Sequence, residues 1–476
     1  MMKTYPMYIA GDFREKEGTI PVEDPFKEEI FAQIPQADRQ DLAECIEKAR
    51  TAQKVWQLTP LKERSDLVLG VSHVIIDHLK ELAEIESKEI GKPIKETLFV
   101  DIPLAAHCFE YYGSLVKDFP ASLTASREDT VDMVHYLPFG VAGIYLPYNV
   151  PLMIFGFNAA AALAAGNAVI VKLSEFGSLS LLTLAKYLHE MEFPRGLINF
   201  ITGEGPIIGR ALAASDVDII SFTGSGDTAQ EIFKQITRPK KLLCELSGVN
   251  MSAIFADADK GEALENLLAS TFMKQGQMCI GTSIALIEED IYDEFLSMLV
   301  SKTEKIKLGD PLSSTTHMGP LRSKGHLEKV MNKVEKFKNT GRIVTGGKRI
   351  DMRGYFFEPT VIEIERMVYE ECFDPILLVK KCNREEMELL IEDNPTGLIL
   401  QIWTRDIKKA QALAMQAHYG TVWINTFAQM DTTTPFGGCK GSGWGRVLSK
   451  WGLFEYLQPK HIGLCFAKSQ ASGWFG

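Results

Sequence analysis

The stretch that decides the fold is DIISFTGSGDTAQEI, residues 218–232. It begins with a short β-branched and apolar run, passes through a glycine-rich turn and continues with helical spacing. Gly224, Gly226 and Ala229 match G-x-G-x-x-A between a strand and a helix, the fingerprint of a dinucleotide site. The same glycines also suit a tight strand-to-helix turn, so this motif alone leaves both interpretations open.

Strands and helices alternate around this stretch. AVIVKLS (168–174) and LINFITG (197–203) predict buried strands that end in loops, and SLLTLAKYLHEME (180–192) predicts the helix between them. Further helices are predicted at residues 41–57, 63–91, 261–275 and 291–306, and a helix end, a turn and a strand at 334–347. This alternation predicts an α/β fold with parallel sheets that are covered on both faces.

The composition bounds the class of protein. A chain of 476 residues is too long for one ordinary core, so two or three domains are expected. The net charge of −11, without a run of lysine or arginine, argues against a nucleic-acid or membrane surface. The most apolar region, residues 155–171, is interrupted by Asn158, Gly166 and Asn167, and the N-terminus has no signal-peptide core. A soluble protein that acts on small molecules is expected.

The eight cysteines are scattered, without a CxxC pair or Cys/His ligand spacing. Reduced thiols in the cytoplasm are therefore expected, and no metal site. Cys279 lies in KQGQMCIGT (274–282), with no histidine near it in sequence. By itself this thiol could be a buried filler, a metal ligand, half of a disulfide or a nucleophile.

Two acids compete for the ribose of a dinucleotide. The spacing rule of the fingerprint, roughly 20 residues beyond the glycines, selects Glu245. Glu175 is the alternative, because it follows Lys172 closely at the end of a predicted strand. The residues alone leave this choice open.

Seven motifs together resemble the aldehyde dehydrogenase superfamily, in the family's order and at its approximate spacing, from about residue 5 to residue 460. They are PFGVAGIYLPYNVPL (138–152), AAGNAVIVKLSE (164–175), SFTGSG (221–226), CELSG (244–248), GQMC (276–279), EECFDPIL (370–377) and PFGGCKGSGWGR (435–446). The resemblance implies a Rossmann-like nucleotide-binding domain, an α/β catalytic domain and a small β extension for oligomerisation.

The resemblance also implies site residues. Cys279 would be the nucleophile, Glu245 the general base, and Asn149 an oxyanion donor together with the backbone N–H of Cys279. The adenosine ribose would then belong to Lys172 and Glu175. Implied contacts to the rest of the cofactor are Gly224, Ser225, Leu246, Glu371 and Phe373.

The chemistry of aldehyde oxidation agrees with these residue types. A planar carbonyl carbon has no electron-rich C–H bond to donate as hydride, so a tetrahedral adduct must form first. A thiolate can form it near neutral pH because the ordinary pKa of a thiol is only about 8.5. The adduct's oxyanion needs placed donors, and the thioester left after hydride transfer needs water activated by a base. A histidine is not required.

Structural alternatives remain for each of these residues. Cys279 could be a small buried hydrophobe, and Glu245 a salt-bridged structural acid. Asn149 could shape a turn between prolines, Ser225 could only cap a helix, and Glu371 could be a solvated acid.

The expected cofactor is NAD, with NADP possible, because a carboxylate at Glu175 accepts ribose hydroxyls but repels a 2′-phosphate. The resemblance implies a substrate tunnel lined by Val150, Ile154, Phe157, Met278, Ile280, Phe427, Met430 and Phe436. These residues are apolar, so the expected substrate is a neutral hydrophobic aldehyde, aliphatic or aromatic. The alternatives are a CoA-acylating or phosphorylating relative and a catalytically silent binding protein of the same fold.

The sequence departs from the family's usual pattern at several points. Lys274-Gln275 stands where asparagine is usual before GQ, and Ser247 makes ELSG of ELGG. Val249 and Ile284 occupy positions where a lysine and an arginine are common. Asp374 makes FDP of FGP. None of these changes removes a catalytic group, but they leave the substrate open.

Three parts are expected: a nucleotide-binding domain at 1–118 and 139–247, a catalytic domain at 248–446, and bridging segments at 119–138 and 447–476. The runs DTVDMVHYL and KHIGLCFAK look like strands without a covering helix, and need a partner edge. By resemblance they would form a homodimer or homotetramer.

Overall fold

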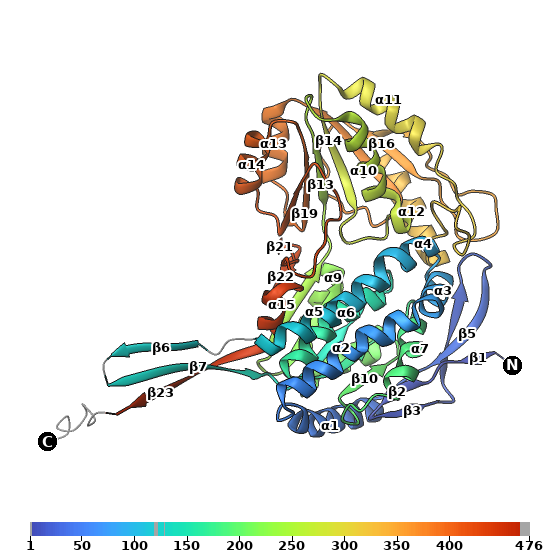
Figure 1. Ribbon diagram of the computed structural model, residues 1–476. Coiled ribbons are helices and arrows are strands. Elements are labelled where there is room, and N and C mark those ends of the chain that lie inside the picture. Colours follow the sequence, from blue (N-terminus) through green and yellow to red (C-terminus); the bar gives the residue numbers. More distant parts are fainter. Residues whose placement is uncertain (1, 119–121, 128, 467–476) are drawn as a thin grey trace.

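The protein is described from a computed structural model, in which residues 2–118, 122–127 and 129–466 are placed. Two large mixed sheets, each with helices packed against it, form the two main bodies, and a narrow three-stranded sheet projects from the side of one of them (Figure 1). The predicted α/β fold with parallel sheets is confirmed.

The first large sheet has a parallel centre and antiparallel edges. Its strands, in spatial order, are β22 (Gly443–Trp444), β12 (Lys241–Leu246), β11 (Ile219–Gly224), β8 (Val141–Tyr145), β9 (Ala168–Lys172), β10 (Ile198–Ile201), β2 (Met7–Ile9) and β3 (Asp12–Arg14). The central strands are buried along their whole length, as a parallel sheet with both faces covered requires.

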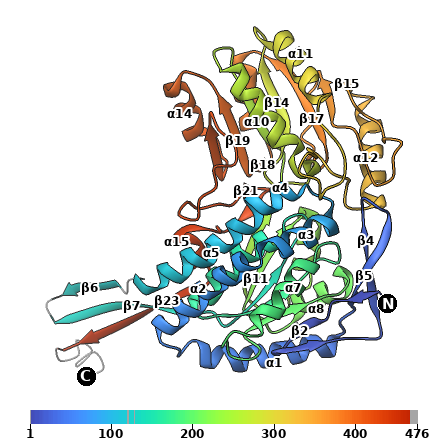
Figure 2. The same ribbon diagram turned by 45° about the vertical axis from the view of Figure 1, so that its right-hand side comes forward.

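The helices of this body pack around that sheet (Figure 2). They are α1 (Arg39–Trp56), α2 (Leu61–Asp77), α3 (Leu79–Ile90), α4 (Ile94–Glu96), α5 (Ile102–Leu115), α6 (Pro151–Ala165), α7 (Leu179–Leu188), α8 (Arg210–Ala214), α9 (Gly226–Phe233) and α15 (Ser449–Glu455). Short helical segments of other types are the π-helices η1 (Thr97–Asp101) and η3 (Gly205–Gly209) and the 3₁₀-helix η2 (Val116–Asp118). Helix α6 is apolar on nearly all sides because it is buried almost completely.

The second large sheet is parallel except at the β15 edge. Its strands, in order, are β15 (Gly341–Thr345), β16 (Thr360–Ile364), β17 (Ile376–Cys382), β14 (Thr282–Glu288), β13 (Asn250–Ile254), β19 (Ile399–Trp403) and β20 (Thr421–Ile424). Along β14, Ile284 and Leu286 enter one apolar cluster while Ala285 and Ile287 enter another. The alternation shows that each face of the sheet carries its own core.

The remaining elements complete this body and its borders. The helices are α10 (Lys260–Phe272), η4 (Met273–Gly276), α11 (Tyr292–Thr303), α12 (Lys324–Phe337), α13 (Arg384–Glu392) and α14 (Ile407–Gln416). Small sheets are formed by β1 (Lys3–Thr4), β5 (Glu29–Pro35) and β4 (Thr19–Asp24), and by β18 (Thr396–Gly397) with β21 (Cys439–Lys440). No helix among the placed residues is both long and apolar enough to cross a bilayer.

The projecting sheet consists of β6 (Ser122–Arg127), β7 (Thr130–Pro138) and β23 (Leu457–Cys465). Strand β23 pairs antiparallel with β7 from Leu457↔Pro138 to Cys465↔Thr130. The two runs expected to be strands are therefore strands, and they pair with each other. Parts of the expected bridging segments, residues 119–121, 128 and 467–476, lie outside the described residues.

One helix prediction missed an internal break, and another was wrong at its C-terminal end. The helix expected at 63–91 is divided at His78 into α2 and α3, and α3 ends where Gly91 adopts φ 88°. The helix expected at 261–275 ends at Phe272, because Lys274 and Gln275 take left-handed conformations with φ 53° and 59°. Long-range contacts of these side chains, described below, override their helix propensity.

Candidate active site

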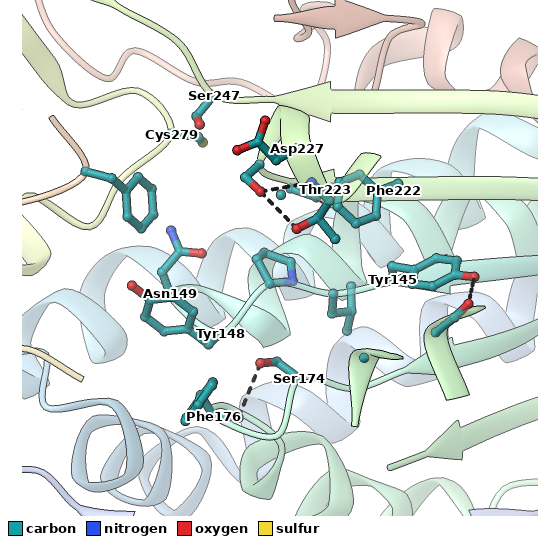
Figure 3. A pocket seen from close by; sticks show the side chains of 18 of the residues that line it. Tyr145, Tyr148, Asn149, Ser174, Phe176, Phe222, Thr223, Asp227, Ser247 and Cys279 are labelled. Atoms are coloured by element: carbon teal, nitrogen blue, oxygen red, sulfur yellow. Dashed lines mark hydrogen bonds between the residues drawn. The ribbon is translucent and has the colours of Figure 1, made fainter. Parts of the chain in front are cut away.

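A cavity of about 970 Å³ lies between the two large sheets. The ends of β8, β9, β11 and β12 and the loops that follow them form one side, and the segments before β14 and β17 together with the start of α12 form the other. Of the residues expected at the site, those that line it are Asn149, Val150, Ile154, Lys172, Glu175, Gly224, Ser225, Glu245, Cys279, Glu371 and Phe373. Figure 3 shows Asn149, Ser247 and Cys279 around one part of this cavity.

A second, much smaller cavity adjoins the first, since Ile154, Glu245 and Cys279 line both. It brings in three more expected residues, Leu246, Phe157 and Phe436. The rings of Phe157 and Phe436 meet edge to face, with 6.4 Å between their centroids.

Four residues expected in the substrate tunnel line neither cavity in the described part of the chain: Met278, Ile280, Phe427 and Met430. Met278 is buried, whereas Ile280, Phe427 and Met430 are partly buried and pack against the main core. Ring contact with Trp423, centroid to centroid 5.6 Å, holds Phe427 in that packing. Leu398 and Val447 line the smaller cavity instead, and neither was expected from the sequence.

Lys172 and Glu175 form an ion pair where β9 ends, with Nζ 3.3 Å from Oε2. Burial lowers the pKa of Lys172, and the charge of Glu175 opposes that effect. The Glu175 side chain keeps 26% of its surface exposed. Its carboxylate therefore borders the cavity with room to accept further hydrogen bonds.

The glycine-rich turn leads from β11 into α9. Ser225 is the N-cap of α9, and its hydroxyl accepts a hydrogen bond from the backbone N–H of Thr228 at 3.3 Å. The capping role considered as an alternative is therefore present, and Ser225 also lines the cavity. A Cβ added at Gly205 or Gly226 would meet no atom within 4 Å, so both glycines border open space. The volume and this open helix N-terminus fit a dinucleotide.

Asn149 ends the loop that precedes α6, whose first residue is Pro151. The buried side-chain amide donates a hydrogen bond from Nδ2 to the backbone carbonyl of Gln277 at 2.8 Å. An amide nitrogen carries two hydrogens, so one N–H remains for another acceptor. The contact joins Asn149 to the loop that carries Cys279.

Cys279 lies in the loop that joins η4 to β14. Asn250, at the start of β13, donates to the carbonyl of Cys279 at 2.7 Å and to that of Gly281 at 2.9 Å. Burial raises the pKa of the Cys279 thiol to about 12, and the negative charges of Glu245 and Glu371 add to the shift. The charge of Lys274 and the residue's own backbone N–H act in the opposite direction.

Glu245 stands near the end of β12, paired in register with Thr223 of β11. Burial raises the pKa of its carboxyl well above the ordinary value, against the effects of Arg446 and the backbone N–H of Gly438. Among the described residues, Oε2 has no hydrogen-bond partner. A buried, unpartnered carboxyl oxygen next to a cavity is available to a water or a substrate atom.

One departure from the family pattern, Ser247, acts on Glu371. Burial raises the pKa of Glu371, and a hydrogen bond from the Ser247 hydroxyl lowers it. Lys333 donates to the backbone carbonyl of Glu371 at 3.0 Å. The hydroxyl that distinguishes ELSG from ELGG therefore favours the ionised form of this carboxyl at the cavity wall.

The structure also reveals polar wall residues that the sequence analysis missed. The Tyr148 hydroxyl donates to Gln277 Oε1 at 3.1 Å. Asp374 contacts Nε2 of His326 at 2.7 Å and forms an ion pair with Lys333. Only Asp374 gave a signal, as a departure from FGP, because the others acquire their roles through long-range contacts.

Comparisons with known proteins agree with this geometry. The model of the aldehyde dehydrogenase family matches residues 13–462. The chain is 36% identical to the betaine aldehyde dehydrogenase of Bacillus subtilis (strain 168), covering 98% of this chain and 99% of that protein. It is 34% identical to the peroxisomal aminoaldehyde dehydrogenase 2 of Pisum sativum, covering 99% and 98%.

A solved NAD⁺ complex of an aldehyde dehydrogenase from Bacillus cereus is similar in structure, with a TM-score of 0.95, 31% identity, and 98% and 97% of the two chains covered. The chain therefore belongs to the aldehyde dehydrogenase family. It is an NAD-dependent oxidoreductase that acts on aldehydes.

Proposed function

We propose that this enzyme oxidises a neutral, hydrophobic aldehyde to its carboxylic acid through a thioester on Cys279. The observation that carries the proposal is the convergence of Cys279, Asn149 and Glu245 on one cavity, with Asn149 bonded to the Cys279 loop. These three groups supply a nucleophile, an oxyanion donor and a base.

The first step is addition to the carbonyl. Sγ of ionised Cys279 forms a bond to the carbonyl carbon, and the π electron pair moves to the oxygen. The second N–H of Asn149 and the backbone N–H of Cys279 would donate to that oxyanion. Because Asn149 is buried and already bonded to Gln277, its remaining N–H is held without rearrangement.

Lys172 and Glu175 would hold the adenosine ribose of NAD, Gly224 and Ser225 the pyrophosphate, and Glu371 and Phe373 the nicotinamide ribose, with Leu246 nearby. NAD bound there would supply the acceptor for the hydride that leaves the tetrahedral carbon as the C=O bond re-forms. The residues of this chain then hold a thioester on Cys279, shielded by the cavity walls.

Hydrolysis of that thioester needs an activated water. Glu245 would accept a proton from the water as its oxygen attacks, and the C–S bond breaks to return the thiolate. Its unpartnered Oε2 supports this role. A CoA-acylating reaction would not need this base, so the presence of Glu245 favours hydrolysis, and the intact reactive groups disfavour a silent binding protein.

Substitutions of Cys279 and Glu245 are expected to affect different kinetic phases of NADH formation. Cys279→Ala should abolish turnover because no adduct can form, whereas Cys439→Ala, a thiol outside both cavities, should retain it. Glu245→Gln should give one rapid equivalent of NADH and then slow turnover, because acylation precedes the step that needs the base. Stopped-flow absorbance of NADH measures both phases. A Glu245→Gln enzyme with the wild-type steady-state rate would refute the assignment of the base.

NAD should be preferred over NADP in this chain. The Glu175 carboxylate can accept ribose hydroxyls and repels a 2′-phosphate, while its ion pair with Lys172 reduces that repulsion. Glu175→Gln is expected to raise the NADP/NAD ratio of kcat/KM by roughly fivefold to tenfold, equivalent to about 1 kcal/mol. Glu190→Gln, which removes an exposed acid from the same part of the chain, is the control. An unchanged ratio would place the ribose elsewhere.

The substrate proposal rests on the walls near Cys279. Val150, Ile154, Phe157 and Phe436 are buried apolar side chains that line the cavities there. An anionic substrate would need a cationic partner to offset desolvation of its charge. These walls favour an uncharged carbon chain.

A cationic aldehyde is the second candidate. The similar enzymes of Bacillus subtilis and Pisum sativum are named for betaine aldehyde and aminoaldehydes. The edge-to-face pair of Phe157 and Phe436 lies close enough to Cys279 to line a cavity with it, and aromatic faces attract organic cations.

A kinetic panel decides between these substrates. For straight-chain aldehydes kcat/KM should rise up to about fourfold per added methylene, from about 0.8 kcal/mol of burial each, until the space is full. Betaine aldehyde, 4-aminobutanal and succinate semialdehyde are compared with neutral aldehydes of similar length. Preference for an anionic aldehyde would show that the assigned walls do not form the pocket. Preference for the cationic ones, reduced in Phe157→Leu, would select the second candidate.

We also propose the three-part division at 1–118 with 139–247, 248–446, and 119–138 with 447–476, and a homodimer or homotetramer joined through the projecting sheet. Outer strands β6 and β23 and the sheet's projection from the body support this assembly. Light scattering at micromolar concentration should give at least twice the monomer mass, and a monomer would contradict it.

A reducing, cytoplasmic location is proposed as well, supported by buried free thiols such as Cys45 and Cys108.

A further inference from the structure

A cluster of buried charges lies behind the walls of the cavity. Lys92 is fully buried and pairs with Glu86 and Asp101, with Nζ 2.7 Å from an oxygen of each. Lys274, with 7% of its side chain exposed, pairs with the other oxygen of Asp101 at 3.1 Å. Asp101 thus bridges two lysines. Burying such charges is costly unless each is paired, so the cluster specifies a fixed arrangement.

Lys274 belongs to a turn of unusual backbone conformation. Lys274, Gln275 and Gly276 have φ of 53°, 59° and 72°, three consecutive residues in the left-handed region. A non-glycine residue is disfavoured there, so surrounding contacts must hold it. Gly276 is required because a Cβ would lie 2.0 Å from the carbonyl oxygen of Asp374.

The contacts that hold this turn come from the first body. The backbone N–H of Lys274 donates to Glu96 at 3.3 Å, and Gln275 Nε2 donates to the Gly91 carbonyl at 2.9 Å. The carbonyl of Lys274 accepts Gln277 Nε2 at 3.1 Å. Residue 274 therefore anchors the loop from both its backbone and its side chain.

The same cluster reaches the oxyanion donor. Lys92 Nζ donates to the backbone carbonyl of Asn149 at 3.1 Å, while the Asn149 side chain donates to the carbonyl of Gln277. Asp101, at the end of the π-helical segment Thr97–Asp101, links Lys92 to Lys274. A closed path of polar contacts thus joins the loop of the nucleophile to the donor, and π-helical segments often occur at such places.

Charged side chains of both signs surround Cys279 and Lys274. Glu245 and Glu371 face the thiol of Cys279 and disfavour its ionised form, whereas the ammonium of Lys274 favours it. Around Lys274 itself lie Asp101 and Glu96, and burial raises the pKa of Glu96 to about 7.

We propose that Lys274 is a positioning residue of this enzyme: its ammonium, fixed by Asp101, holds the left-handed turn against Asn149 and stabilises the ionised form of Cys279. The proposal rests on the assignment of Cys279 as nucleophile. It gives a departure from the family pattern a role in activating the thiol.

The test is alkylation of Cys279 by iodoacetamide in the cofactor-free enzyme from pH 6 to 10, followed by peptide mass spectrometry. Lys274→Asn removes the charge and keeps a residue that tolerates the left-handed region. It should shift the profile to higher pH and reduce the rate at pH 8 by roughly tenfold, the effect of one pKa unit. Lys274→Arg should stay within about twofold of the wild type. Lys302→Asn, which removes an exposed ion pair on α11, should leave the profile unchanged.

A purely structural role predicts a different result. Folded Lys274→Asn, checked by circular dichroism, would then alkylate with the wild-type pH profile, and that outcome overturns the proposal. Lys274→Gln is measured in parallel, and failure of both neutral variants to fold would also assign Lys274 to structure alone. Full turnover in Cys279→Ala would instead refute the proposed function, which keeps the two failures distinguishable.

Discussion

The site depends on a constraint of parallel sheets, whose strands all end at the same edge. Here the first sheet directs that edge toward the cavity, whereas the second sheet borders the cavity at the edge where β14 and β17 begin. Strands β11 and β12 are neighbours, and their register sets Thr223 opposite Glu245. The glycine-rich turn and the acid proposed as base therefore leave adjacent strands, while Cys279 enters from the segment that precedes β14. Strand order and register therefore bring residues that are far apart in sequence to the same cavity.

Burial in this cavity has opposite consequences for different steps. It raises the pKa values of Cys279 and Glu245, which disfavours the ionised forms that addition and hydrolysis need. It would also keep bulk water from the proposed thioester and strengthen each electrostatic contact inside. The donors around the site, including the Gly438 N–H toward Glu245, recover part of the ionised population without opening the cavity.

Sequence patterns predicted the features that depend on short segments. The strands at 168–174, 197–203 and 218–224 were found near their expected bounds, and Asn149, Glu245 and Cys279 share a cavity as the motifs implied. Features that depend on distant contacts were not predictable. The left-handed turn at Lys274 needs acids from residues 96–101, which lie far away in the sequence. Such a contact leaves no local pattern.

The departures from the family pattern divide into two physical groups. Val249 and Ile284 are buried in the core of the second sheet, where an uncharged side chain is what the packing requires. The other three lie at the cavity wall or in the charge cluster behind it, and each acts on a charged group: Ser247 on Glu371, Asp374 on Lys333, and Lys274 on Asp101. None of the three replaces a proposed catalytic group. Their side chains act on charged groups around the cavity, so these departures from the family pattern bear on the electrostatics of the site and leave the proposed reacting groups unchanged.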